Sequence, residues 1–309
     1  LHLIANEQGS RSTPTCVAFT EVEQLVGDAA KSQMARNAKN TVTDLVFMLG
    51  RHWDEQAMQN ALSHWRFSAS RGPDGCAQVE LAIKHEQKKL AVPRLLSLVV
   101  ANMRGAADAF CGAAIKEVVL AFPPHFTVAQ RDALLDAARM GGMRVKHMIS
   151  QPLAVALLYS YTTATATVAS ASNSATPGLS SSGPSSAVED AGVESSVSKA
   201  TAAAACQMPA LLLVIDVGGS SSSVSLVQQD MSQRSEVDGV GQFCVLSTAS
   251  DLQLGGNEVD LRLRQYVLKD IRRRSRIDLS DNSRAMSRLL LSCEACKRSL
   301  STSTQAAPT

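Results

Sequence analysis

The sequence lacks several features that would mark particular classes of protein. It has no apolar run of the roughly 20 residues needed to cross a bilayer, and a run such as Ala210–Ile215 already stops at Asp216. Aromatic residues make up only 4% of the 309 residues, too few for a platform on which single-stranded bases would stack. The 30 basic and 28 acidic residues leave a net charge of +2, which argues against a surface that binds nucleic acid throughout.

The seven cysteines form neither a disulfide framework nor a metal site. Their number is odd and their positions are scattered, which fits a reducing compartment such as the cytoplasm. Cys293 and Cys296 make one C-x-x-C pair, but a structural zinc site needs four ligands and the sequence has no second pair.

Two catalytic motifs are also missing from the sequence. It contains no G-x-S-x-G turn and no G-x-x-x-x-G-K-[ST] loop, so a serine hydrolase and a Walker-type ATPase are both unsupported.

What the sequence does contain is two α/β regions separated by a stretch of low complexity. Thr162–Ala205 consists largely of Ser, Ala and Thr and has no aromatic residue. Such a stretch cannot bury enough apolar surface to offset the entropy lost on ordering. We therefore expect a first lobe over residues 1–161, a disordered insertion over 162–209 and a second lobe over 210–309.

Hydrophobic spacing predicts that strands and helices alternate on both sides of this insertion. The expected strands are Leu1–Ala5, Thr15–Thr20, Glu117–Phe122, Arg144–Ile149, Leu211–Asp216, Val224–Gln228 and Phe243–Thr248. The expected helices are Asp28–Met34, Pro93–Phe110, Thr127–Met140, Pro152–Tyr161, Asn257–Arg274 and Ser280–Leu300. Thr127 is the expected N-cap of its helix, and Asp281 or Asn282 that of the last one.

The best chemical signal is an apolar strand that delivers Asp216 and then a turn made of Gly218, Gly219, Ser220 and Ser221. Glycines have no Cβ, so backbone N–H groups can approach a phosphate there, and the hydroxyls add donors. The carboxylate could hold Mg²⁺ through water. An ordinary Gly/Ser hairpin is the alternative interpretation of this segment.

Two further motifs are weak when taken alone. Gly255 and Gly256 open a predicted helix, where N–H groups point outward, although a tight turn explains them equally well. Four polar residues share one face of the last predicted helix, at positions i, i+3, i+4 and i+7. They are Glu294, Lys297, Arg298 and Ser301. A solvated, salt-bridged face is the alternative for this group.

Several segments on both sides of the insertion follow the pattern of one known family nearly residue by residue. They are Ile4–Pro14, Val17–Phe19, Val26–Lys31, Asn40–Val42, Leu49–Arg51, Gln130–Arg131, Leu254–Gly256 and Cys293–Ala306. Taken together, they resemble the nucleotide-binding domain of the heat shock protein 70 (DnaK-type) chaperone family. The resemblance implies an α/β, actin-like two-lobed ATPase fold that clamps ATP or ADP with Mg²⁺ between its lobes.

The resemblance also implies roles for the motifs above. Gly219, Ser220 and Ser221 match the family's second phosphate-binding turn, and Asp216 matches its Mg²⁺-associated aspartate. The polar face of the last helix matches the family's adenosine-contacting helix. The implied nucleotide-binding set is Asp216, Gly218, Gly219, Ser220, Ser221, Gly255, Gly256, Glu294, Lys297, Arg298 and Ser301.

The departures from the family pattern fall on catalysis. Val46 stands where the family has a catalytic lysine, Gln151 where it has a glutamate, and Ser223 where it has an aspartate. Removing one preorganised polar group typically costs ~10²–10³ in rate. We therefore expect an ATP-binding chaperone domain with weak or no hydrolysis and a regulatory, co-chaperone role. An ordinary ATP-hydrolysing chaperone and a non-binding interaction scaffold remain alternatives.

The resemblance covers only part of the family's pattern. The family's first phosphate turn would precede Leu1, and its substrate-binding domain would follow Thr309, so we expect the fold to be incomplete at both ends. The implied partners are a J-domain co-chaperone, a nucleotide-exchange factor and, if a substrate-binding domain follows, unfolded clients; we expect no membrane. Arg284–Met286 and Lys297–Thr302 are similar to the atypical ribosome-associated branch, which adds the ribosome as an expected partner.

Overall fold

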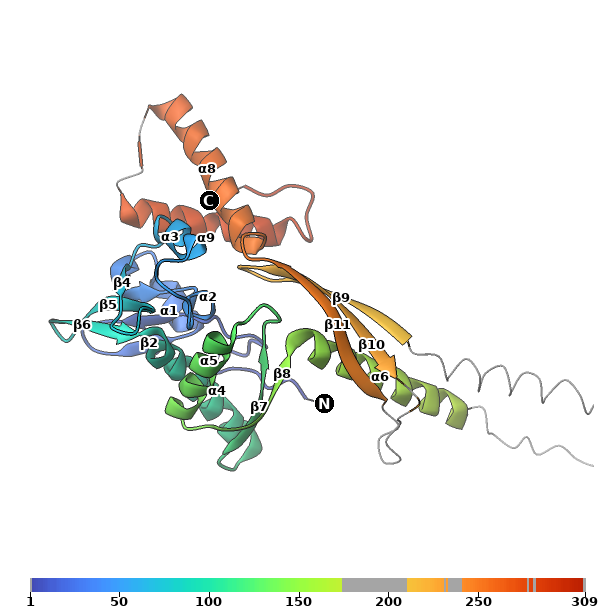
Figure 1. Cartoon of the computed structure of the whole chain (residues 1–309). Helices are drawn as coiled ribbons and strands as arrows, with labels where there is room; N and C mark the ends of the chain where they lie inside the picture. The colour runs from blue at the N-terminus through green and yellow to red at the C-terminus, as the bar shows by residue number, and fades with distance from the viewer. Residues whose placement is uncertain are drawn as a thin grey trace, which may run out of the picture. The chain divides into compact units, whose positions relative to one another are not determined.

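The computed structural model describes residues 2–173, 210–230, 232, 241–276, 278–279 and 282–307. These residues alternate between strands and helices, as Figure 1 shows along the chain. The chain divides into two compact units. The first takes residues 1–148, 217–222 and 251–309, and the second takes 149–216 and 223–250. The division into lobes over residues 1–161 and 210–309 stays a prediction.

Two small antiparallel sheets occupy the N-terminal part of the first unit. In one, β1 (Val17–Phe19) lies between β2 (Gln24–Val26) and β3 (Thr41–Val42). In the other, β5 (Ala77–Ile83) lies between β4 (Ser68–Arg71) and β6 (Glu86–Ala91). Short helices accompany these strands: α1 (Asp28–Gln33), η1 (Ala38–Asn40), α2 (Leu45–Met48) and α3 (Gln56–Leu62).

One hydrophobic core joins these sheets to two longer helices, α4 (Val92–Cys111) and α5 (Val128–Met140). Along β5, buried and partly buried residues alternate, as a half-buried strand requires. The largest fully buried side chains of this core are Val17, Val42, Leu45, Met48, Leu49, Met58, Val79, Leu81, Val92, Leu95 and Val99. A two-stranded sheet of β7 (Glu117–Phe122) and β8 (Arg144–Ser150) follows.

Helix α5 begins with the N-cap that the sequence predicts, and α4 ends at a glycine. Thr127 and Gln130 form a capping box, in which the Thr127 Oγ1 accepts from the Gln130 N–H at 3.3 Å. The Gln130 Oε1 accepts from the Thr127 N–H at 3.1 Å. Gly112 ends α4 at a φ of 64°, a left-handed conformation that a glycine adopts without a steric cost.

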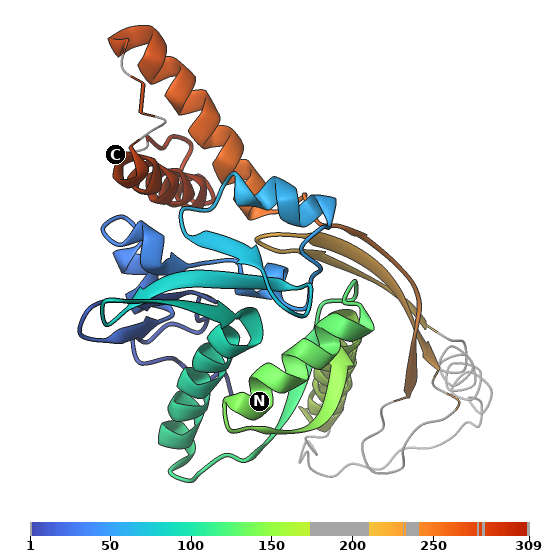
Figure 2. The same cartoon turned by 60° about the vertical axis from the view of Figure 1, so that its left-hand side comes forward.

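The first unit ends in two helices, α8 (Gly256–Ser275) and α9 (Ser283–Ser299), which pack on each other (Figure 2). Asn282 caps α9, because its Oδ1 accepts from the N–H of Ala285 at 3.0 Å. This agrees with one of the two caps expected for that helix.

The second unit contains a sheet in the order β11-β10-β9 and one helix among its described residues. Its elements are α6 (Gln151–Asn173), β9 (Ala210–Val217), β10 (Ser222–Asp230) and β11 (Gln242–Asp251). The Gln229 Nε2 of β10 donates to the Ser160 Oγ of α6 at 2.7 Å, and both residues are buried. A polar contact therefore ties this sheet to its helix.

Three sequence-based expectations need correction or restriction. The sequence predicts a strand over Leu1–Ala5, but residues 2–5 have no regular structure, since no described strand pairs with them. Helix α6 runs to Asn173, beyond its expected end at Tyr161. The remainder of the expected insertion, 174–209, lies outside the described residues.

No helix in the described ranges is both long and apolar enough to cross a membrane.

Candidate functional site

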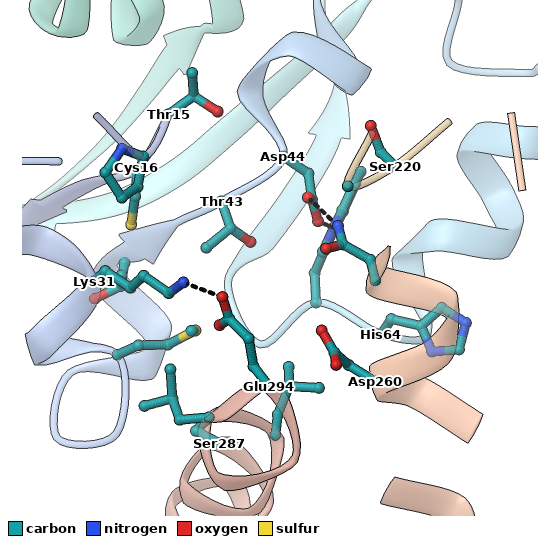
Figure 3. A pocket seen from close by; sticks show the side chains of 18 of the residues that line it. Thr15, Cys16, Lys31, Thr43, Asp44, His64, Ser220, Asp260, Ser287 and Glu294 are labelled. Atoms are coloured by element: carbon teal, nitrogen blue, oxygen red, sulfur yellow. Dashed lines mark hydrogen bonds and ion pairs between the residues drawn. The ribbon is translucent and has the colours of Figure 1, made fainter. Parts of the chain in front are cut away.

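A cavity of about 480 Å³ lies within the first unit, lined by its N-terminal residues and by helices α8 and α9 (Figure 3). Gly219 and Ser220 also line it. Small-molecule pockets in proteins typically measure about 300–1,000 Å³. Residues from both ends of the chain therefore enclose a space of the size that a small ligand needs.

The two glycine motifs predicted from the sequence pack directly on each other. The Gly256 N–H donates to the Gly218 carbonyl at 3.0 Å, and the Asn257 N–H donates to the Gly219 carbonyl at 2.7 Å. A Cβ on Gly255 would lie 2.4 Å from the Gly219 carbonyl oxygen. Only a glycine permits this approach, so the residue type at position 255 follows from packing.

The turn leaves two backbone donors at the cavity wall. The Gly218 N–H donates to the Ser221 carbonyl at 2.9 Å, which closes the turn. In the part of the chain that the structure describes, the N–H groups of Gly219 and Ser220 donate to no protein acceptor. Successive unused N–H groups in a turn are suited to binding an anion.

Glu294 on α9 binds two cations at the cavity. Its Oε1 accepts from the Lys31 Nζ of α1 at 2.7 Å and from the Arg298 Nη2 at 2.8 Å, and Figure 3 marks the Lys31 contact. Burial raises the pKa of Glu294, but the hydrogen bonds and charges of Lys31 and Arg298 outweigh it and lower the pKa overall. Glu294 is therefore ionised at neutral pH and joins α9 to α1.

Lys297 fastens α9 to the beginning of α8. Its Nζ donates to the Asp260 Oδ2 at 2.7 Å and to the Gly256 carbonyl at 2.9 Å. Asp260 is buried, and this burial raises its pKa while the Lys297 ammonium opposes the shift. Ser301 lies beyond the end of α9, is exposed, and donates its N–H to the Arg298 carbonyl at 3.1 Å.

The structure brings some of the predicted site residues to the cavity and places others elsewhere. Gly219, Ser220, Glu294 and Arg298 line it, as does Val46, which also packs against the core. Three predicted positions belong to the second unit: Asp216 on β9, Gln151 at the start of α6 and Ser223 on β10. Asp216 is exposed and Ser223 is buried.

Asp44 is a cavity residue that the sequence does not point to. It has a φ of 56°, its Oδ2 accepts from the Trp65 Nε1 at 2.9 Å, and its Oδ1 accepts from the Asn257 Nδ2 at 3.2 Å. Burial raises the pKa of this carboxyl against the lowering effect of these hydrogen bonds. No local pattern could predict the pairing, because Asp44 and Asn257 lie 213 positions apart.

Comparison with known proteins adds evidence from the whole chain. The family model described as Hsp70 protein matches residues 1–176 and 184–308. The chain is 34% identical over 307 residues to the putative heat shock 70 kDa protein 7 of Homo sapiens, covering 99% of this chain and 70% of that protein. It is 33% identical over 305 residues to the heat shock 70 kDa protein of Emericella nidulans, covering 99% of this chain and 39% of that protein.

A further relative is a ribosome-associated molecular chaperone of Nakaseomyces delphensis. It is 32% identical over 305 residues, which are 99% of this chain and 42% of that protein. The chain therefore spans about two fifths of the length of the Emericella and Nakaseomyces relatives.

Proposed function

Because the chain belongs to the Hsp70 family, we propose that it binds ATP or ADP with Mg²⁺ at the cavity of its first unit. The observation that carries this proposal is the glycine turn. The unused N–H groups of Gly219 and Ser220 border a cavity of about 480 Å³, and an anionic phosphate is the ligand such donors favour.

The residues present are compatible with a Mg²⁺ ion that arrives with the nucleotide. Among the described residues, no three His, Cys, Asp or Glu side chains gather into a metal site. Mg²⁺ commonly takes one or two carboxylates and completes its shell with phosphate oxygens and water. By the family resemblance, Asp216, which directly precedes the glycine turn in the sequence and is exposed, is the residue that would supply the carboxylate. The bound ion would neutralise charge on the phosphates.

We further propose that this domain hydrolyses ATP weakly or not at all. The Val46 side chain borders the cavity and has no charge or donor. Gln151 and Ser223 are neutral where the family pattern has carboxylates. Phosphoryl transfer depends mainly on positioned charge, and each missing preorganised group typically costs ~10²–10³ in rate.

In the cell, such a domain would act as a regulatory or co-chaperone member of the family, in the cytoplasm. Its proposed partners are a J-domain co-chaperone and a nucleotide-exchange factor, with unfolded clients if a substrate-binding domain is present in the whole protein. The Nakaseomyces relative is a ribosome-associated chaperone, which supports the ribosome as a further partner.

Binding is tested by titrating ATP into the protein in a calorimeter, with Gly255→Ala as the diagnostic variant. We expect at least tenfold weaker binding, because the new Cβ would push the glycine turn away from α8. Gly105→Ala in α4 is the matched control, since its Cβ would meet nothing within 4 Å. Absence of ATP binding by the unmodified protein would favour the interaction scaffold.

Hydrolysis is tested by single-turnover measurement on the unmodified protein and on the combined variant Val46→Lys, Gln151→Glu, Ser223→Asp. We expect the combined variant to be at least about 100-fold faster, from the magnitude for one restored group. A rate in the unmodified protein equal to that of the variant would contradict weak hydrolysis and favour an ordinary ATP-hydrolysing chaperone.

A further inference from the structure

Two arginines from distant parts of the sequence line the cavity without an acidic partner among the described residues. Arg66 lies between α3 and β4, and Arg264 lies on α8. Arg264 is only 6% exposed. Within the described part of the chain, neither guanidinium forms an ion pair, and the Nε of each is a buried donor with no acceptor.

The two guanidinium groups are close enough to affect each other. Burial lowers the pKa of Arg264, and the charge of Arg66 lowers it further. His64 belongs to the same cluster: burial lowers the pKa of its imidazole, and Arg264 and Arg66 add to that effect. His64 is therefore neutral at physiological pH, and the positive charge of the cluster resides on the two arginines.

The carboxylates around this cluster each bind another group, although the Asp260 Oδ1 is a buried acceptor with no partner among the described residues. Asp260 binds Lys297, Glu294 binds Lys31 and Arg298, Glu258 binds Arg262, and Asp44 accepts from Trp65 and Asn257. A buried cation without a partner is costly to the fold. An anion that enters the cavity from solvent would satisfy both guanidinium groups and remove that cost.

We propose that Arg66 and Arg264 form an oxyanion subsite for a phosphoryl group in this cavity. A guanidinium presents a planar fork of donors that matches phosphate oxygens, and two such forks fit a doubly charged group better than a single carboxylate. The phosphoryl group comes either from inorganic phosphate or from a bound nucleotide, and the second source rests on the proposed function. In that case the arginines supply the cavity with the positive charge that Val46 does not.

The first test uses inorganic phosphate as the probe and the whole chain as the protein. Phosphate should raise the melting temperature of the unmodified protein, and Arg264→Met and Arg66→Met should each weaken phosphate binding at least tenfold. Without phosphate, Arg264→Met should melt at the same or a higher temperature, because it removes an unpaired buried charge. Arg274→Met is the matched control, since Arg274 lies on the same helix but is exposed and paired with Asp270.

The second test repeats the titrations with ATP, ADP and adenosine. Both methionine variants could bind ATP tenfold more weakly while they bind adenosine as before. That result identifies the nucleotide as the source of the phosphoryl group. It supports the subsite even if free phosphate binds too weakly to detect. Phosphate binding that the variants abolish, in a protein that binds no ATP, supports the subsite and refutes the proposed function. Unchanged affinity for both phosphate and ATP in both variants overturns the subsite and leaves the proposed function standing. If one variant does not fold, the other decides, because the two arginines lie on different elements.

Discussion

At the scale of single residues, Glu294 is held by two cations of different origin. Lys31 comes from α1, while Arg298 lies one turn along the same helix as Glu294. The side chain of Glu294 is 20% exposed and that of Arg298 is 74% exposed. Solvent therefore screens the Arg298 contact more strongly, and the Lys31 contact should contribute more to stability.

This arrangement predicts a pH-dependent effect of Glu294→Gln. The pKa of Glu294 is lowered in the folded protein, so its stabilisation is present above the ordinary glutamate pKa of about 4.3 and is lost as the pH falls through the folded value. We expect the variant to lose roughly 1–2 kcal/mol at pH 7 and much less at pH 3. Urea unfolding at both pH values measures this.

The control for that prediction is Glu258→Gln, whose ion pair with Arg262 joins neighbouring turns of one helix. Such pairs typically contribute about 0.3–0.5 kcal/mol. A loss for Glu294→Gln that is equal at pH 7 and pH 3 would show that its carboxylate charge is not what stabilises the fold.

The sequence could predict residues whose chemistry is local but not those defined by distant partners. Gly218, Gly219, Gly255 and Gly256 form recognisable turns, and the structure packs the two turns together. By contrast, nothing in the neighbourhood of Arg264 reveals that it will be buried without a partner among the described residues. Burial and charge compensation depend on elements that lie far away in the sequence.

At the scale of elements, caps and apolar spacing determine how well a segment can be predicted. Helix α5 begins after Thr127 and ends at Met140 as expected, and β7 spans Glu117–Phe122 as expected. Strand β6 has no such signal, because its Glu86–Ala91 segment is mostly polar and exposed. It becomes a strand only by pairing with β5, a contact that its own residues do not indicate.

The capping box of α5 gives a prediction at this scale. Thr127→Ala removes the Oγ1 that accepts from the Gln130 N–H, so we expect about 1 kcal/mol of destabilisation in urea unfolding. Thr127→Ser keeps a hydroxyl at the same place and should restore most of the loss. Equal losses in the alanine and serine variants would mean that the threonine methyl, and not the cap, is what matters.

At the scale of the molecule, the first unit is assembled from three stretches of chain. Composition indicated two α/β regions around a low-complexity stretch, and the family resemblance implied the ATPase fold. Neither showed that α8 and α9 would share a unit with the N-terminal sheets. That grouping arises from contacts such as Lys31 with Glu294 and Asp44 with Asn257, which no linear pattern encodes.

One compact unit should lose stability as a whole when its core is damaged. Leu95→Ala removes a fully buried side chain and should cost about 2–5 kcal/mol. Hydrogen exchange should then become faster in α9 as well as in α4, although Leu95 lies on α4. Leu254→Ala is the control, because Leu254 is 58% exposed. Unchanged exchange in α9 would show that the helix opens independently of the core.

The separation of Lys31 from Glu294 has a consequence for the timing of synthesis. The two residues are 263 positions apart, and translation at about 5–20 residues per second separates their appearance by roughly 10 to 50 s. During that interval the N-terminal residues that line the cavity lack the part of its wall that α8 and α9 supply. The cavity can therefore enclose the proposed ligand only after α9 has emerged from the ribosome.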